Sequence, residues 1–412
     1  MKRTSTARVT AVAAAALLGI AGLAGCSSGS STTGSSDQGQ SAGSVSASNS
    51  SSENSSGGTI KIGFFSPQSG SEASDGKSAL DAAQLAVKDI NAAGGLDGKK
   101  IQLVQYDDGS DPKQAVSIAT KLTTQDNVAA VVSGSYSDQT LAAASIFQRA
   151  GVPMLAAYAV NPGIPGTGDE IFQIATSGPV EGKAGAQALI KDLGAKKIAI
   201  ISIDNDFGTA LVQGFTEQAA KLGATIVSTN KNQFGEKDFG PVIDKAVAAG
   251  ADGFYMVEYA AEGQQFLTAF RQRNLTQKIV GTEGIDSTQQ FIEPNGKLAD
   301  GMVFTTVLNR DSTDPTTQAF IKDFTSAYGH APDMVGATTY DSFKVLQAAS
   351  KNGTTADNLK AGITDLANFQ GVTGTVEKFV NRISVHPVEL QVFKDGAVHH
   401  YGTVDDPDII NP

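Results

Sequence analysis

The stretch that decides the fold reads Thr59-Ile-Lys-Ile-Gly-Phe-Phe65, and an alanine-rich segment from Ser74 to Ala93 follows it. β-Branched and aromatic residues fill the first run, which predicts a buried strand. In the second segment small and apolar residues recur at helical spacing, at Ala79, Ala82, Ala83, Ala86, Val87 and Ile90. Gly94-Gly95 then ends the predicted helix. A strand followed by such a helix predicts the start of a βαβ unit.

Short β-branched runs and longer helical patterns keep alternating after this first pair. The further predicted strands are Lys100–Tyr106, Val128–Val132, Val152–Ala156, Lys197–Ser202, Thr225–Thr229, Gly253–Val257, Lys278–Gly281 and Met302–Thr306. An αβ unit repeated this often predicts a doubly wound α/β fold with parallel sheets, in which ligands bind beyond the carboxyl ends of strands. The loops expected there are 66–75, 134–138, 157–162, 204–207, 258–262 and 282–286.

The last third of the chain has a different order. Predicted helices near 316–328, 338–350 and 356–366 come before two late strands, and a late crossover back into a first lobe would explain this. The body from Thr59 to Pro412 holds about 350 residues, more than one hydrophobic core usually supports. Two domains are therefore expected.

The first 26 residues are predicted to be a signal peptide. Lys2, Arg3 and Arg8 are basic, and an apolar stretch from Ala11 to Leu17 follows that is too short to span a bilayer. Leu23-Ala24-Gly25-Cys26 looks like the bacterial lipobox, whose cysteine receives a lipid, so Cys26 is the predicted lipidation site. The alternative is an ordinary leader with an incidental cysteine. Because Cys26 is the only cysteine, disulfides and cysteine-based sites in the body are excluded.

Composition predicts a flexible linker and limits the partners. Residues 27–58 are mostly Ser, Gly, Thr and Asn, which cannot bury enough apolar surface to fold. A coil of this length spans roughly 30 Å. The net charge of -11 argues against nucleic acid or an anionic lipid surface as a partner. We expect membrane association through the lipid anchor only.

Several motifs of the body resemble the leucine/isoleucine/valine-binding family, which are type I solute-binding proteins of ATP-driven (ABC) importers. They are Ile90–Ile101, Tyr106–Ala115, Thr140–Ile146, Ala150–Pro153 and Gly281–Asp286. The resemblance implies the type I periplasmic binding protein fold, in which two Rossmann-like lobes joined by three crossovers close on a ligand. By analogy, one lobe takes 59–177 plus 308–384 and the other takes 178–307 plus the tail, 385–412.

The resemblance also implies one wall of a ligand site. Ser135-Tyr136-Ser137-Asp138 falls on the family's serine-bearing turn, with Ser137 on the serine that binds the ligand's carboxylate. Hydroxyl and N–H groups at a helix start suit an anion, although a plain helix cap would explain Ser137 equally well. The next loop contributes Tyr158 and Ala159, while Val160 stands where relatives carry a threonine. The Tyr158 phenol could replace that hydroxyl, or the ring could simply pack.

Glu283 falls on the family's carboxylate that pairs with the ligand's α-ammonium. The alternative is a solvated surface glutamate. Less certain matches are Phe207, where relatives often have tyrosine, Glu258 and Tyr259 near a ligand-side aromatic, and Asp75, for which a solvated loop position is the favoured alternative. The stretch 172–178 also departs from the family's pattern. These departures suggest a ligand that is either less polar than the family's usual aliphatic amino acids or held differently.

Other classes of function fit the sequence less well. Gly76-Lys77-Ser78 follows a strand but lacks the glycine spacing of a phosphate-binding loop. No hydrolase elbow or zinc-protease motif is present, and we expect no catalysis, cofactor or metal. The His399-His400 pair could chelate a metal, but neighbouring strand residues point to opposite faces. Asp107-Asp108 and Asp204-Asn205-Asp206 resemble turns and helix caps rather than cation sites.

The sequence therefore predicts a monomeric, extracytoplasmic, lipid-anchored solute-binding protein of an ABC importer. It is expected to capture a small-molecule ligand, most plausibly an amino acid, and to deliver it to permease subunits. A ligand-sensing module that passes its closed state to a signalling partner would use the same fold and cleft, and the sequence does not separate the two.

Overall fold

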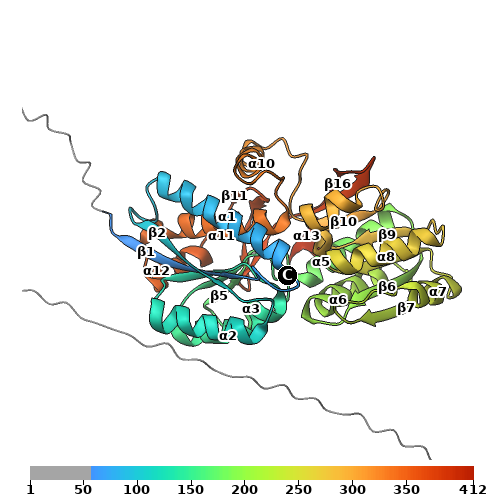
Figure 1. The fold of residues 1–412 in the computed structure, drawn as a ribbon, viewed down its shortest axis with the longest axis horizontal. Helices are drawn as coiled ribbons and strands as arrows, with labels where there is room; N and C mark the ends of the chain where they lie inside the picture. Colours follow the sequence, from blue (N-terminus) through green and yellow to red (C-terminus); the bar gives the residue numbers. More distant parts are fainter. Residues whose placement is uncertain (1–56) are drawn as a thin grey trace, which may run out of the picture. The chain divides into compact units, whose positions relative to one another are not determined.

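The computed structural model describes residues 57–412; the predicted signal peptide, Cys26 and nearly all of the predicted linker lie outside the described residues. Two seven-stranded sheets and one small hairpin form the framework (Figure 1). In spatial order the first sheet holds β13 (Lys378–Val380), β14 (Ile383–Val385), β5 (Ile171–Gln173), β4 (Met154–Ala156), β3 (Ala130–Ser133), β1 (Thr59–Ser66) and β2 (Lys100–Asp107). The second sheet holds β16 (Ala397–Val404), β15 (Val388–Lys394), β10 (Val303–Thr306), β9 (Lys278–Gly281), β8 (Gly253–Val257), β6 (Lys197–Ile203) and β7 (Thr225–Asn232). The hairpin is β11 (Phe369–Gly371) with β12 (Gly374–Val376).

Each sheet, with the helices that pack on it, forms one lobe. The helices of the first lobe are α1 (Ala73–Ala92), α2 (Pro112–Lys121), α3 (Ser137–Ala150), α4 (Gly163–Gly166), α10 (Pro315–Tyr328), α11 (Met334–Ala349) and α12 (Ala356–Thr364). The helices of the second lobe are α5 (Gly178–Ala186), α6 (Asp206–Lys221), α7 (Gly240–Ala248), α8 (Ala260–Gln272), α9 (Glu293–Asn295) and α13 (Pro407–Ile410). Shorter turns are η1 (Leu122–Asp126), η2 (Gln187–Asp192), η3 (Glu283–Ile285), η4 (Thr288–Ile292) and η5 (Ser350–Asn352).

The strand and helix that open the body are confirmed. Ile62, Phe64 and Phe65 of β1 are fully buried, because β1 pairs in parallel with β2 on one side and β3 on the other. The alanine face of α1 packs on this sheet, and its small side chains let α11 lie directly beside it (Figure 1). Gly95 follows the helix with a φ of +88°, a left-handed conformation that favours glycine.

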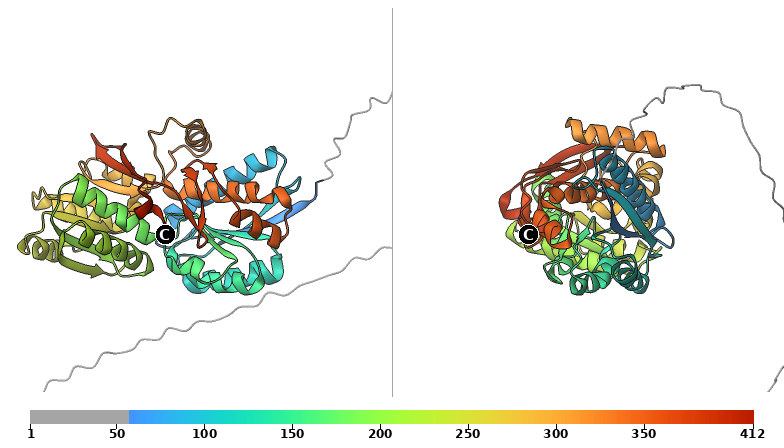
Figure 2. Two further views of the ribbon diagram at one scale, coloured as in Figure 1. Left: turned by 180° about the vertical axis from the view of Figure 1, so that it is seen from behind. Right: turned by 90° about the vertical axis from the view of Figure 1, so that its left-hand side faces the viewer.

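Helices cover both faces of each sheet. In the first lobe α1 and α11 pack on one face, while α2 and α3 lie side by side on the other (Figures 1 and 2). In the second lobe α5 and α6 cover one face, and α7 and α8 the other. Sheets buried on both faces explain why strands such as β8 are apolar throughout rather than alternating.

The chain passes between the two sheets three times. It leaves the first sheet after β5, returns to the first lobe after β10 and crosses again between β14 and β15. The late crossover predicted from the helix-rich last third is therefore present. The exact lobe boundaries, 59–177 plus 308–384 and 178–307 plus 385–412, remain predictions.

The expectation of parallel sheets with only two late strands is incomplete. β13 pairs antiparallel with β14, and both β10 and β16 pair antiparallel with β15. The two-residue turn Asn381-Arg382 joins β13 to β14, and Asp395-Gly396 joins β15 to β16. All four turn residues have positive φ. So short a connection can only join antiparallel neighbours.

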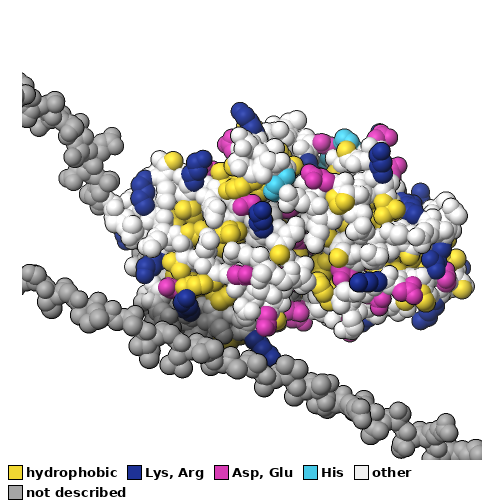
Figure 3. Space-filling model, viewed as in Figure 1, with side chains coloured by type: hydrophobic (Ala, Val, Ile, Leu, Met, Phe, Trp, Pro, Cys, Tyr) yellow, Lys and Arg dark blue, Asp and Glu magenta, His cyan; other side chains and the backbone are white. Residues whose placement is uncertain are grey.

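The surface of the described part carries few large apolar side chains. Among residues 57–412, the exposed large apolar side chains are Val116, Phe234 and Tyr401. Figure 3 shows basic and acidic side chains interspersed over the face in view. Within residues 57–412 no helix combines the length and apolarity that a bilayer span requires.

Candidate functional site

Segments of both lobes meet around one small cavity. Its lining residues are Asp75, Tyr136, Ser137, Tyr158, Ala159, Met334 and Val335 from the first lobe, and Phe207, Tyr259, Glu283 and Gly284 from the second. Most lie at helix starts or in loops after parallel strands, where an α/β sheet places its ligands. All but Gly284, Met334 and Val335 were singled out from the sequence, and their role in binding stays a prediction.

Glu283 is buried in this cavity without a protein partner for its charge. It begins η3, directly after β9, and only 4% of the residue is exposed. Its carboxylate makes no hydrogen bond or ion pair to any residue in the described part of the chain. Burial raises the pKa of Glu283 well above its usual value, and the charges of Glu181 and Asp286 raise it further. A solvated surface position is excluded.

A second carboxylate, which the sequence reading missed, supports the loop of Glu283. One oxygen of Glu181, on α5, accepts hydrogen bonds from the Glu283 N–H at 2.9 Å and from the Thr305 hydroxyl at 2.5 Å. Its other oxygen is buried without a partner. Burial raises the pKa of Glu181 to about 7. The available signal was a lone glutamate among the Gly and Ala residues of α5.

Ser137 lines the cavity as the first residue of α3 and does not cap that helix. Tyr136 precedes it at the cap position, and no side chain caps α3. The Ser137 hydroxyl accepts a 3.3 Å hydrogen bond from the N–H of Val160, which ties the two predicted loops together. The capping alternative is therefore wrong, and the hydroxyl keeps its proton for another acceptor.

The Tyr158 hydroxyl is engaged inside the protein. It donates a 2.6 Å hydrogen bond to the carbonyl of Gly134, and 3% of the residue is exposed. Its only proton is therefore not available to replace the hydroxyl that Val160 lacks. The ring, however, forms part of the cavity wall.

Aromatic rings from both lobes fill most of the cleft. The centroid of Tyr136 lies 4.7 Å from that of Tyr259 and 5.5 Å from that of Tyr158, while Phe207 stacks on Tyr259 at 4.9 Å. The space left among them is about 10 Å³, enough for about one water molecule. An amino-acid ligand would therefore have to displace at least one ring.

Asp75 is a buried bridge between the lobes. It lies in the first turn of α1, is 4% exposed, and accepts hydrogen bonds from the Tyr136 hydroxyl and, at 2.7 Å, from the hydroxyl of Ser287 in the second lobe. Burial raises its pKa. The favoured alternative of a solvated loop residue is wrong, because the helix begins earlier than the loop was expected to end.

Four predicted residues do not line the cavity. Ser135 and Val160 are fully buried beside it, and Asp138 is half-buried in the first turn of α3. Glu258 is buried in the second lobe, where it accepts a 3.1 Å hydrogen bond from the side chain of Asn232. Burial raises its pKa to about 8.

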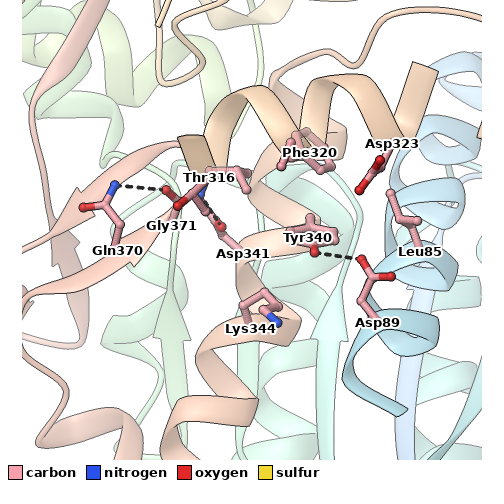
Figure 4. Close-up of a pocket in the computed structure, with 12 residues that line it drawn as sticks. Leu85, Asp89, Thr316, Phe320, Asp323, Tyr340, Asp341, Lys344, Gln370 and Gly371 are labelled. Atoms are coloured by element: carbon pink, nitrogen blue, oxygen red, sulfur yellow. Dashed lines mark hydrogen bonds between the residues drawn. The ribbon is translucent and has the colours of Figure 1, made fainter. Parts of the chain in front are cut away.

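A larger cavity of about 200 Å³ lies within the first lobe and shares no residue with the one around Glu283. Figure 4 shows Leu85 and Phe320 on its apolar wall and the Tyr340 hydroxyl pointing to Asp89, to which it donates at 2.9 Å. Asp341 also lines it but is fully engaged by the Val372 and Thr373 segment. Among the carboxylates that line it, Asp341 is the buried one, and its oxygens already accept hydrogen bonds from the protein.

The rival sites of the sequence analysis fall in ordinary structural settings. Gly76 lies within α1, and a Cβ there would come within 1.9 Å of the Pro67 carbonyl oxygen, so this glycine serves close packing. His399 and His400 lie near different carboxylates, those of Asp311 and Glu389. Residues 57–412 hold no group of three or more His, Cys, Asp or Glu side chains placed for a metal ion.

Known proteins share both the sequence pattern and the fold. The pattern of the periplasmic binding protein family matches residues 59–396. An amino acid binding protein of Pseudomonas aeruginosa is 30% identical over 303 residues, which cover 73% of this chain and 81% of that protein. The branched-chain amino acid transporter substrate binding protein LivJ from Streptococcus pneumoniae, solved in complex with isoleucine, has a TM-score of 0.77 at 27% identity and covers 84% of this chain and 99% of its own.

A solute binding protein of an ABC transporter from Rhodopseudomonas palustris, in complex with 3,4-dihydroxy benzoic acid, has a TM-score of 0.76 and covers 85% of this chain and 99% of its own. Because the two sequences are only 22% identical, this match shows that the two proteins share a fold and nothing more. The predicted resemblance and the two-lobed fold are thus confirmed by independent matches in sequence and in structure. The chain belongs to the periplasmic binding protein family.

Proposed function

We propose that this protein is the extracytoplasmic substrate-binding subunit of an ABC importer, and that it captures a small amino acid or a related amine-bearing carboxylate. It would act as a monomer that delivers the ligand to permease subunits, without chemical conversion. The family supports the transport role. The names of the relatives from P. aeruginosa and S. pneumoniae, an amino acid binding protein and a branched-chain amino acid transporter subunit, support the ligand class.

The observation that carries the ligand proposal is the unpaired carboxylate of Glu283. An ionised carboxylate buried without a partner is strongly unfavourable, and a ligand ammonium would remove that penalty. A ligand that lacks the amine would gain no ion pair with Glu283, which gives selectivity. Neither Lys nor Arg nor His lines the cavity, so an aromatic acid without an amine would find no cation there.

The opposite wall offers groups for the ligand's carboxylate. The Ser137 hydroxyl has an available proton, and the first N–H groups of the 14-residue helix α3 begin at the same place. Helix N-termini favour anions through these N–H groups and the helix dipole. In this proposal the two ends of one ligand are held by different lobes.

Lobe closure follows from that division of contacts. A ligand shifts the equilibrium toward the closed form only when it binds that form more tightly than the open form. Contacts to Ser137 in one lobe and Glu283 in the other are made together only on closure. We propose the ranges 59–177 plus 308–384 and 178–307 plus 385–412 as the two moving bodies.

Calorimetry with the purified protein tests the ligand class. We expect an amino acid to bind, and Glu283→Gln to weaken it by about 2–5 kcal/mol, because the ion pair is lost. Glu293→Gln, an exposed glutamate outside the cavity, is the matched control and should leave binding unchanged. Binding restricted to ligands without an amine, or an unchanged affinity of Glu283→Gln, would overturn the proposal.

We also propose that Cys26 is lipidated and holds the protein on the cell membrane, with residues 27–58 as the leash. The carrying observation is the Leu-Ala-Gly-Cys sequence after a short apolar segment. More than one acyl chain is needed for stable anchoring. Mass spectrometry of the mature N-terminus should find a diacylglyceryl modification on Cys26, and Cys26→Ala should release the protein from the membrane fraction. An unmodified N-terminus at another residue would contradict this.

A further inference from the structure

The cavity between the lobes holds two buried carboxylates and no cation. Asp75 and Glu283 both line it, each is 4% exposed, and no Lys, Arg or His is among the lining residues. Asp75 belongs to α1 of the first lobe and Glu283 to η3 of the second, so the two acidic side chains stand on opposite walls. The α-ammonium of a monoamine ligand, held at Glu283, leaves Asp75 without a counter-charge.

The surroundings of Asp75 do not supply that counter-charge. The hydroxyls of Tyr136 and Ser287 donate hydrogen bonds to it, but both groups are neutral. The charged groups that interact with it are acids as well: Asp286 raises the pKa of Asp75, and Asp75 raises the pKa of Asp333 and of Glu72. The guanidinium of Arg310 is paired with Asp286. Two hydroxyl donors leave a carboxylate with unused acceptor sites for a further donor.

The other walls of the cavity are suited to an organic cation. Tyr136, Tyr259 and Phe207 form one ring cluster, with centroids 4.7 and 4.9 Å apart, and the ring of Tyr158 packs edge-on against Tyr136. Aromatic faces attract ammonium and guanidinium groups, most strongly where water is excluded. An aliphatic side chain would use the apolar surface of these rings but not the charge of Asp75.

We propose that the ligand carries two cationic groups, one bound at Glu283 and the other at Asp75, so that this site takes a diamine or a diamino acid. The inference rests on the proposed function, because it keeps the ammonium contact at Glu283 and adds a second one. The inference differs from the proposed function in the class of ligand, which here carries two cations rather than one. A branched-chain amino acid supplies one cation, a diamine such as putrescine supplies two, and lysine or ornithine supplies two together with a carboxylate for Ser137.

Calorimetry with the full chain and four probes, lysine, ornithine, putrescine and leucine, tests the inference. We expect the best two-amine probe to bind at least about tenfold more tightly than leucine. Lysine or ornithine ahead of putrescine would identify a diamino acid, and the reverse order a diamine. Leucine binding as tightly as every two-amine probe would overturn the inference.

Two variants separate the charge of Asp75 from its structural role. Asp75→Asn removes the charge, keeps an acceptor oxygen for one of the two hydroxyls and presents an amide donor to the other, so it should abolish the preference for two-amine probes over leucine, whatever its effect on the absolute affinities. Ser287→Ala keeps the charge and removes the contact between lobes, so it should weaken all probes alike and preserve the preference. If Asp75→Asn does not fold, as judged by its melting transition, the probe ranking of the wild type and of Ser287→Ala still decides.

The outcomes also separate this inference from the proposed function. Leucine binding that depends on Glu283, with no gain for the two-amine probes, would leave the proposed function intact and reject the second subsite. Failure of all four amine probes, together with binding of benzoate, would reject both. A preference for two-amine probes that survives Asp75→Asn would show that the second cation binds elsewhere, and would reject the role of Asp75.

Discussion

The hydroxyl of Ser287 donates a 2.7 Å hydrogen bond to the carboxylate of Asp75, although 212 positions separate the two residues in the chain. Asp75 lies in the first turn of α1 and Ser287 follows η3, so this bond joins the two lobes directly. Both residues are buried, which protects the bond from competition by water. It stabilises the closed arrangement without contacting a ligand at Ser287.

Ser287→Ala should therefore weaken ligand binding through the closure equilibrium. A hydrogen bond to a charged group contributes about 1.5–3 kcal/mol, and its loss lowers the population of the closed form. We expect the affinity for every ligand to fall by a common factor of at least about tenfold. Calorimetry measures the affinities, and small-angle scattering measures closure. An affinity loss confined to one ligand would contradict this explanation.

Ligand affinity should rise with pH. Burial, and then the charges of Glu181 and Asp286, hold the pKa of Glu283 well above its usual value, so the free protein keeps a proton there. An ammonium favours the ionised form, and binding must then release that proton. The affinity should gain up to about tenfold per pH unit while Glu283 is protonated in the free protein.

Calorimetry in two buffers of different ionisation enthalpy measures that proton release directly. Glu283→Gln cannot release a proton and should show a flat profile, while Glu293→Gln should behave as the wild type. Proton uptake on binding would contradict the assignment of the ligand's ammonium to Glu283.

The folded protein should become less stable as the pH rises from about 5 to 7. Burial raises the pKa of Glu181 to about 7 and, together with the charge of Asp75, also that of Asp333 to about 7. In the unfolded chain both groups ionise near 4.5 and 3.8, so the folded state holds more protons in this window. The free energy of unfolding then falls by about 1.4 kcal/mol per pH unit for each retained proton.

Urea unfolding at several pH values measures this slope. Glu181→Gln removes one of the retained protons, so its free energy of unfolding should decline less steeply than that of the wild type. A stability that increases between pH 5 and 7 would contradict the burial of these carboxyls.

Tyr158→Phe should lower stability without changing ligand selectivity. The hydroxyl of Tyr158 satisfies the buried carbonyl of Gly134, and its removal leaves that oxygen without this donor. The expected loss in the free energy of unfolding is about 1–3 kcal/mol. Chemical unfolding measures the loss, and a ligand panel measures selectivity. A changed ligand ranking would show that the phenol contacts the ligand after all.

Arg310→Met should be strongly destabilising. Arg310 pairs with Asp286, whose side chain is fully buried and also accepts a 2.5 Å hydrogen bond from the Thr306 hydroxyl. Removing the guanidinium leaves a buried charge unpaired, which costs about 3–5 kcal/mol. The double variant Arg310→Met, Asp286→Asn should recover part of that loss. Urea unfolding of the two variants checks both statements.

The amino-acid pattern was enough to predict the repeated αβ architecture, and the family resemblance of its motifs predicted most of the residues that line the cavity. An apolar run followed by a helical pattern indicates a strand that is buried on both faces of a sheet. For this reason the predicted ends of β1 and α1 differ from the observed ends by at most one residue. The loops that hold Tyr158 and Glu283 could be located because parallel strands end at the same edge. The resemblance to the leucine/isoleucine/valine-binding family then singled out these two residues. Two late strands were expected, but their antiparallel pairing and the short strands β13 and β14 were not predicted, because no helix separates these strands.

Which of these side chains already have a hydrogen-bond partner inside the protein became visible in the folded structure. The Tyr158 hydroxyl donates its proton to the carbonyl of Gly134. A Glu181 oxygen accepts a hydrogen bond from the N–H of Glu283 at the start of η3, and Asp75 accepts one from Ser287 of the other lobe. Each of these contacts joins residues that are distant in the chain, and local spacing carries no information about such a pairing. The charge balance of the cavity likewise depends on which side chains packing places around it, and none of its lining residues is a Lys, Arg or His.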